Sequence, residues 1–378
     1  MLKKAIIFIL SAIMIFTAVV CVQAQEDVYA QENTSAESVE SPTEETVSFL
    51  LGSVSNILAE DEEALSAAYA DKFEQMTYSD PDIGLSITYN LYLPKGYDAS
   101  ESYPMVVFIA DSSCAGKDAQ QSLTQGRGAL VWASADWQSV YPTIVAVPTY
   151  PEVILDDHGS YTTTEYVELT KRFIDFMTNE YSVTGVYGTG QSMGCMTTLI
   201  LASEYPGLYD AYMFVDGQWD ISTLSGLEDQ TFIYFAAEDD SNAWNSAQEV
   251  MAMFDADSVS YKYAQWDGTW SCDELSEAAK ELFVSDENQY FISWLTGTIE
   301  PKESFGQPGN SEGSQNTDGE SPTGESEGES AAQEAGNSEE GESSEAAGGM
   351  NSSAYHMASF DYAYNCVTVM EWLFQQIK

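Results

Sequence analysis

The alternation of short apolar runs with amphipathic segments across the middle of the chain is the feature that most limits its possible folds. Six runs are mostly apolar and are bounded by turn residues: 105–110, 143–148, 183–188, 211–216, 231–236 and 259–264. Such runs are typical of strands that are buried on both faces of a sheet. Between them, segments such as 162–181 and 242–254 carry apolar residues at helical spacing. This order predicts an α/β fold, with a mostly parallel central sheet and helices on both faces.

Three further elements are expected from local patterns. Residues 73–78 and 85–93 alternate apolar and polar side chains around Gly84, which predicts an antiparallel hairpin at the N-terminal edge of the domain. Helices are expected over 193–205 and, closing the chain, over 363–377.

The first 24 residues have the pattern of a signal peptide. Two lysines precede an apolar run, and Val22 and Ala24 suit the positions before a cleavage site. Val20 is bulky where a lipoprotein signal has a small residue before the cysteine, here Cys21. We therefore expect a secreted, extracellular protein that meets a membrane only if this segment stays uncleaved.

Two acidic, aromatic-poor stretches flank or interrupt the expected domain. Residues 25–72 are predicted to be a partly disordered leader, with one or two short helices over 46–70. Residues 301–350 are predicted to be a disordered loop, because they hold almost no large apolar side chain to bury. Since the chain after this loop is again rich in aromatic residues, we expect one catalytic domain over 73–378 with an acidic insertion.

Charge and the scarcity of ligand residues exclude several functions. The chain has 12 Lys and Arg against 61 Asp and Glu, a net charge of −49, which disfavours nucleic acid and anionic membranes as partners. The acidity is typical of a soluble exterior protein, and attraction of a cationic substrate is the alternative. The five cysteines show no CxxC spacing and there are two histidines, so we expect neither a disulfide framework nor a zinc site, and no cofactor.

The sequence Gly190-Gln191-Ser192-Met193-Gly194 fits the pattern G-x-S-x-G between an expected strand and an expected helix. A serine on such a sharp turn is lifted above the sheet, and small residues two before and two after it allow strand and helix to approach. The pattern predicts Ser192 as a nucleophile. The N–H group of Met193, at the helix start, is the expected first oxyanion donor.

A serine hydroxyl needs a base and an orienting acid. His158 precedes the serine and is expected at the rim, whereas His356 follows it and is expected to be the base, in a loop before the closing helix. The acid belongs in the loop after the strand 231–236, where residues 238–240 are Glu, Asp and Asp. These residues alone leave all three open.

The second oxyanion donor is expected at Ser112, after the run 105–110. Substrate contacts are expected from Gln191, Trp132 and Trp219, in or near loops that open towards Ser192. Cys195 is expected to point into the packing of the helix.

With these residues, the chain resembles extracellular α/β-hydrolases grouped with poly(3-hydroxybutyrate) depolymerase-like esterases and predicted peptidases. The likeness covers residues 73–300 and 351–378, through YNLYLPKGYD, GQSMG and YHMASFDYAYN. It implies an α/β-hydrolase fold with a Ser-His-Asp triad, and it places the acid on Asp240. One departure is Ala110-Asp111, where many relatives have His-Gly.

The expected activity is hydrolysis of a carboxylic ester, small or polymeric, through an acyl-enzyme. A serine peptidase of the same fold is the alternative, and a catalytically silent surface protein is a second. The sequence does not predict an oligomeric state.

Overall fold

The structure of the chain is a computed structural model that describes residues 51, 54, 62–157, 159–302 and 342–376. The predicted signal peptide, most of the leader, His158 and the acidic residues 303–341 lie outside the described residues. In the part that is described, no helix is both long and apolar enough to cross a bilayer.

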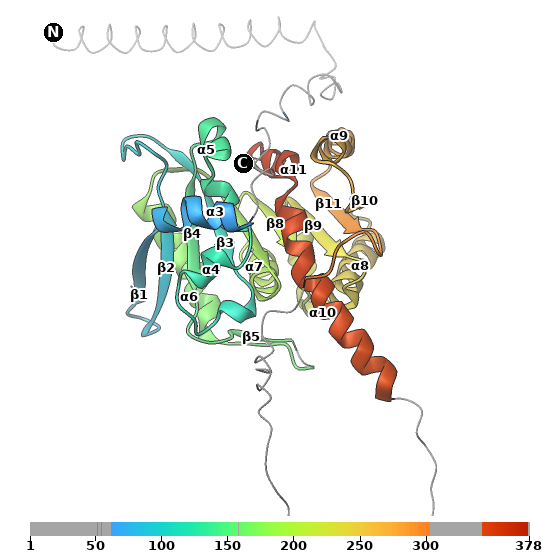
Figure 1. The fold of residues 1–378 in the computed structure, drawn as a ribbon. Coiled ribbons are helices and arrows are strands. Elements are labelled where there is room, and N and C mark those ends of the chain that lie inside the picture. Colours follow the sequence, from blue (N-terminus) through green and yellow to red (C-terminus); the bar gives the residue numbers. More distant parts are fainter. Residues whose placement is uncertain (1–50, 52–53, 55–61, 158, 303–341, 377–378) are drawn as a thin grey trace, which may run out of the picture. The chain divides into compact units, whose positions relative to one another are not determined.

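A nine-stranded sheet forms the centre of the domain, in the order β1-β2-β4-β3-β7-β8-β9-β11-β10 (Figure 1). Strand β1 pairs antiparallel with β2, and β2 antiparallel with β4, while all further pairings are parallel. The strands are β1 (Glu74–Asp80), β2 (Leu85–Tyr92), β3 (Tyr103–Ile109), β4 (Ile144–Thr149), β7 (Val183–Gln191), β8 (Ala211–Val215), β9 (Phe232–Ala237), β10 (Lys262–Trp266) and β11 (Gln289–Trp294). A separate ribbon pairs β5 (Leu155–Asp156) with β6 (Thr162–Thr163).

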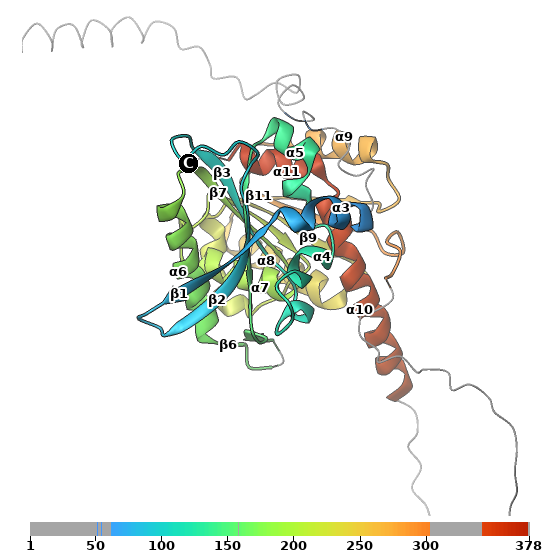
Figure 2. The same cartoon turned by 60° about the vertical axis from the view of Figure 1, so that its left-hand side comes forward.

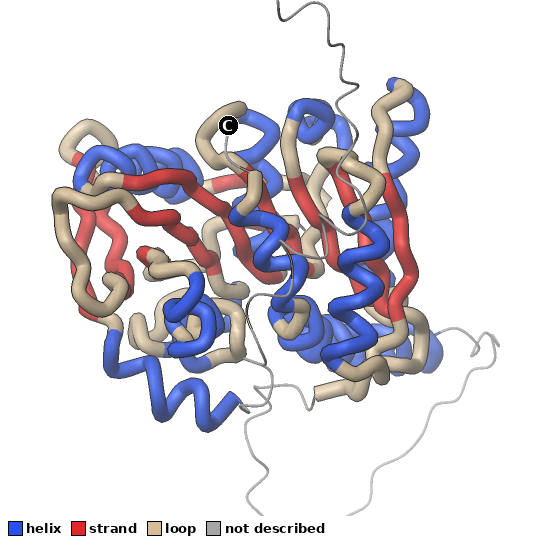
Figure 3. Tube along the Cα trace, turned by 90° about the horizontal axis from the view of Figure 1, so that it is seen from above, coloured by secondary structure: helices blue, strands red, loops and turns tan. Residues whose placement is uncertain are grey.

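Helices cover both faces of this sheet (Figure 3). They are α3 (Glu62–Tyr69), α4 (Gln121–Thr124), α5 (Ala135–Val140), α6 (Glu165–Glu180), α7 (Met193–Glu204), α8 (Ser241–Asp257), α9 (Cys272–Phe283), α10 (Glu342–Tyr364) and α11 (Val367–Phe374). One apolar cluster joins α3, α5, α9, α10 and α11 to the sheet, and a second joins α6, α7 and α8 to its other face (Figure 2).

Strand β8 explains why the central runs are continuously apolar. Met213 and Val215 belong to the first cluster, whereas Tyr212 and Phe214 belong to the second, and all four are fully buried. Alternate side chains therefore enter different cores, and neither face of the strand meets water. The predicted parallel sheet with helices on both faces is confirmed.

The C-terminal region differs from the prediction. Helix α10 begins at Glu342, inside the segment expected to be disordered, and runs through residues 351–364, which were expected to be mainly a loop. A break at Asn365 and Cys366 then separates it from α11, in place of one closing helix over 363–377. Strand β10 begins at Lys262 rather than at residue 259. Strand β11 was not predicted from the sequence.

Candidate active site

Ser192 occupies a strained turn between β7 and α7, and residues 190–194 around it are called the elbow below. Its φ and ψ angles are +52° and −119°, in a region that side chains other than glycine rarely adopt. The neighbouring backbone holds it there: the Ser192 N–H group donates to the carbonyl oxygen of Val215 at 3.2 Å, and its own carbonyl accepts from the N–H of Met196 at 2.8 Å. Strained backbone of this kind is concentrated at functional sites of proteins, which makes Ser192 a candidate functional residue.

The two glycines of the motif are required by close backbone contacts. A Cβ atom at Gly190 would lie 2.5 Å from the carbonyl carbon of Gly194 and 2.9 Å from the oxygen of Ile109. At Gly194 it would overlap the carbonyl oxygen of Ile109. Helix α7 can therefore start directly against β3 and β7 only because both positions lack a side chain.

His356 lies on α10 and contacts Asp240. The Nδ1 atom of His356 is 2.5 Å from Oδ2 of Asp240, and the imidazole packs edge-on against Phe360, with ring centroids 4.9 Å apart. The expectation of a loop around His356 is wrong, since the surrounding residues form a helix whose inner side chains, such as Phe360, join the core. A helix fixes the histidine backbone more firmly than a loop does.

Of the three acidic residues after β9, Asp240 is the one that contacts His356. Its other oxygen, Oδ1, accepts the N–H of Asn242 at 3.2 Å and so caps the N-terminus of α8. Glu238 is bound instead by Gln265 and Ser293, and Asp239 accepts the N–H of Gly297 at 2.7 Å. Because both oxygens of Asp240 have partners, its orientation towards the imidazole is fixed.

Several carboxylates set the electrostatics around the imidazole. Burial by itself lowers the pKa of His356, but the hydrogen bond and charge of Asp240, followed by the charges of Asp216 and Asp111, outweigh burial and raise it above its usual value. Burial raises the pKa of Asp111 and raises that of the Cys195 thiol well above its usual range, which leaves this thiol unreactive.

Ser112 begins the short 3-10 helix Ser112–Cys114 that follows β3, and it lines the same pocket as Met193, the first residue of α7. The turn is held by Asp111, whose Oδ1 accepts the N–H of Ser113 at 2.6 Å. Asp111 itself is 3% exposed. Asp111 therefore serves as the N-cap of this turn.

One pocket of about 760 Å³ brings these residues together. Ser192, Met193, Ser112, Asp240 and His356 all line it. The rest of the wall is formed by a mixture of small polar, apolar and acidic residues: Val153, Leu155, Asp156, Asp157, Met196, Asp216, Gln218, Ser241, Asn242, Ala243 and Ser353. Among the described residues, no group of His, Cys, Asp and Glu is arranged to hold a metal ion.

The three residues expected to contact substrate are not part of this lining. Trp132 is fully buried, 4.9 Å from Trp137 and 5.8 Å from Phe374 between ring centroids, and thus belongs to the core. Trp219 is 5% exposed and packs against Tyr161. Gln191 is 2% exposed and donates to Gln125 at 2.9 Å, which ties the elbow to the segment after α4. Packing or hydrogen bonding inside the protein accounts for each of them.

The pocket also includes residues that the sequence analysis missed. Asp216 directly follows β8, at the carboxyl end of a parallel strand, where functional side chains often gather. Its position in the sequence could therefore have indicated it as a site residue. Gln218 and Asp157 lie in loops, and the Gln218 amide donates to Asp157 Oδ2 at 2.5 Å. No local sequence pattern indicates Gln218 or Asp157 as site residues.

The fold has a counterpart among solved structures. A thermostable esterase superposes with a TM-score of 0.55 at 20% sequence identity, over 82% of this chain and 64% of the esterase, so the match spans less than two thirds of that protein. The chain has an α/β-hydrolase fold.

More distant matches include esterase and peptidase structures. The feruloyl esterase module from Clostridium thermocellum aligns with a TM-score of 0.40 at 16% identity, over 59% of this chain and 80% of the module. Dipeptidyl peptidase 4 from Porphyromonas gingivalis aligns with a TM-score of 0.40 at 12% identity, over 57% of this chain and 35% of the peptidase. No protein-family model matches the sequence, and no curated protein sequence does.

Proposed function

We propose that the chain is a secreted serine hydrolase that cleaves carboxylic esters through an acyl-enzyme intermediate. The observation that carries this proposal is the bond between His356 Nδ1 and Asp240 Oδ2 inside the pocket that also holds Ser192 on its strained turn. Secretion is proposed from the signal-like first 24 residues.

In the acylation step, the Ser192 hydroxyl oxygen attacks the ester carbonyl carbon and His356 Nε2 takes the hydroxyl proton. Asp240 accepts a hydrogen bond from Nδ1–H, which selects the tautomer with a free Nε2 and stabilises the imidazolium without taking its proton. The negative oxygen of the tetrahedral intermediate receives N–H groups from Met193 and Ser112. His356 then gives its proton to the leaving alkoxide oxygen, and the carbon–oxygen bond breaks.

In the deacylation step, a water molecule loses a proton to His356 and attacks the acyl carbon. Collapse of this second intermediate returns the proton to the Ser192 oxygen and releases the acid. The N–H group of Met193 suits oxyanion binding because it belongs to the first turn of α7, where N–H groups have no carbonyl partner within the helix.

The test is labelling of the purified protein with a fluorophosphonate, combined with hydrolysis of p-nitrophenyl esters and peptide anilides. We expect wild type to be labelled and Ser192→Ala not, while Ser139→Ala, at an exposed serine on α5, serves as the matched control. His356→Ala should lose ester turnover. Absence of labelling in the wild type contradicts the proposal, and faster turnover of anilides than of esters assigns the site to a peptidase instead.

A further inference from the structure

Asp216 is a carboxylate in the pocket wall that the mechanism above leaves without a task. It directly follows β8 and is fully buried, with a backbone φ of +44°. A buried carboxylate and a left-handed backbone at a residue other than glycine are both unfavourable. They persist only where the surroundings compensate, so the contacts of Asp216 indicate what it is for.

The first set of contacts reaches the segment that carries Asp240. Oδ1 of Asp216 accepts the N–H of Ala237, the last residue of β9, at 2.8 Å. The Asp216 N–H donates to the carbonyl oxygen of Phe235 at 3.0 Å. Because Asp240 lies three residues beyond Ala237, these bonds fix the point from which its loop leaves the sheet.

The second contact reaches the helix that carries His356. Oδ2 of Asp216 accepts the hydroxyl of Ser359, three residues after His356 on α10. The same hydroxyl lies 2.9 Å from the carbonyl oxygen of His356, and its single proton serves one acceptor at a time. Residues three apart are neighbours on a helix, so this bond holds the turn on which the imidazole is mounted.

We propose that Asp216 is a positioning residue of this site, which holds the loop of Asp240 and the α10 turn of His356 in register and places a third negative charge near the imidazole. This inference rests on the proposed serine hydrolase function. It deepens that function by adding a residue that acts through Asp240 and His356.

Several titratable groups surround His356 and Asp216. His356 faces Asp240, Asp216 and Asp111, and Asp216 in turn faces Asp240, His356, the Cys195 thiol and the Tyr234 hydroxyl. Burial, together with the charge of Asp240, raises the pKa of Asp216 to about 7, against the opposing charge of His356. The charge of Asp216 favours the protonated imidazole, and the ionisation of each group therefore depends on that of the other.

Substitution of Asp216 by Asn separates the charge from the shape. The amide oxygen can still accept from Ala237, and its NH2 group can donate to the Ser359 oxygen, whose own proton then goes to the His356 carbonyl. We expect kcat of Asp216→Asn to fall by about tenfold or more with KM nearly unchanged. The acid limb of kcat/KM should move to lower pH, because the imidazole loses a neighbouring negative charge.

The matched control is Asp210→Asn, at the opposite end of β8, where Asp210 accepts the N–H of Val186 at 2.9 Å. It removes one charge and keeps a similar hydrogen bond far from the imidazole, so its pH profile should equal that of wild type. Ser359→Ala removes the link to α10 but keeps the charge, and is expected to lower kcat with a smaller shift of the acid limb.

A readout that needs no turnover comes from NMR titration of the imidazole signals in the Ser192→Ala background. The chain has two histidines, and His158→Gln identifies the signal of His356. We expect a lower pKa of His356 with Asp216→Asn than with Asp210→Asn. Equal pKa values in these two variants, or an unchanged kcat of Asp216→Asn in an enzyme that fluorophosphonate does label, overturn the inference. Absence of labelling in the wild type contradicts the proposed function instead, and the titration still decides the electrostatic role.

Discussion

Nδ1 of His356 and Oδ2 of Asp240 lie 2.5 Å apart, although 116 residues separate them along the chain. Asp240 stands at the start of α8, at the end of a parallel strand, and His356 arrives on α10 from beyond the acidic segment. The strand ends of the sheet thus supply the proposed acid and nucleophile, and a later helix supplies the proposed base. The pair depends on α10 packing in one position.

The raised pKa of His356 predicts the acid limb of the pH profile. The base acts only when its imidazole is neutral, so activity is present above the pKa in the folded protein and is lost as pH falls through it. Since the carboxylates raise that pKa above its usual value of about 6.5, we expect that, as pH is lowered, kcat/KM begins to fall before pH 6.5 is reached. The measurement is ester hydrolysis from pH 5 to 9, and a flat profile down to pH 5 contradicts the role of His356.

Replacing the acid should damage catalysis far more than binding. In Asp240→Asn the amide can donate to Nδ1 and so favours the wrong imidazole tautomer, and we expect kcat to fall on the order of 10⁴-fold with KM within a few fold. The control is the adjacent Asp239→Asn, whose carboxylate bonds Gly297 rather than His356. Steady-state kinetics on a p-nitrophenyl ester compares the two, and equal losses speak against Asp240 as the triad acid.

The sharp turn around Ser192 could be predicted from sequence because an apolar strand, a five-residue motif and a helix start are contiguous. The parallel sheet followed from runs such as β8, since a strand covered on both faces must be apolar at every position. These features depend on short-range chemistry, which the order of residues records directly.

Other features depend on contacts that no local pattern records. Trp132 was expected near the substrate, but its partner Phe374 comes 242 residues later, on the last helix. The residues around His356 alternate small, polar and aromatic side chains without clear helical spacing, so the helix α10 went unpredicted. Asp216 ends an apolar run, but its contacts with Ala237 and Ser359 are brought together only by the fold and are not recorded in any local pattern.

The acidic lining of the pocket predicts discrimination against anionic substrates. Asp156, Asp157, Asp216 and Asp240 line it, and no Lys or Arg is among its described lining residues. We expect kcat/KM for p-nitrophenyl hydrogen suberate to be about tenfold below that for its neutral methyl ester at about 0.01 M salt. The two values should approach each other at high salt, because the screening length falls.

Two variants locate this effect. Asp157→Asn keeps an oxygen for the Gln218 amide but removes a charge from the pocket wall. It should therefore bring kcat/KM for the anionic ester closer to that for the neutral ester. Asp136→Asn, on an exposed part of α5, changes the net charge equally and should leave the ratio unaltered. A ratio that is the same in all variants and at all salt concentrations assigns the selectivity to shape rather than charge.

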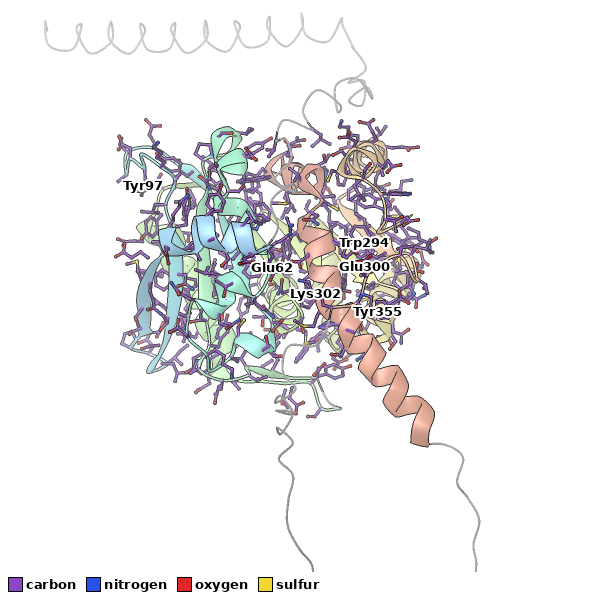
Figure 4. The ribbon with its side chains drawn as sticks, in the orientation of Figure 1. Glu62, Tyr97, Trp294, Glu300, Lys302 and Tyr355 are labelled. Atoms are coloured by element: carbon purple, nitrogen blue, oxygen red, sulfur yellow. The ribbon has the colours of Figure 1, made fainter. Side chains whose placement is uncertain are left out.

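A cluster of ion pairs anchors α10 and predicts a stability effect outside the pocket. Lys302 and Glu62 of α3 are labelled in Figure 4. The Lys302 amine pairs with the Glu62 carboxylate at 2.9 Å and also with Asp361 of α10. Asp361, 14% exposed on its side chain, also accepts the N–H of Arg127 at 3.1 Å. Lys302 therefore joins α3 to the helix that carries His356, five residues before Asp361.

Substitution of Lys302 by Met removes the cation and leaves two carboxylates facing each other, one of them largely buried. We expect the free energy of unfolding to fall by about 1–3 kcal/mol, measured by urea denaturation. Lys280→Met is the matched control, because Lys280 pairs with a highly exposed carboxylate, that of Glu277, within α9. Its expected cost is below about 0.5 kcal/mol, since exposed pairs on one helix contribute little. Similar losses in the two variants mean that Lys302 is an ordinary surface charge and that the apolar core alone holds α10, and with it His356, in place.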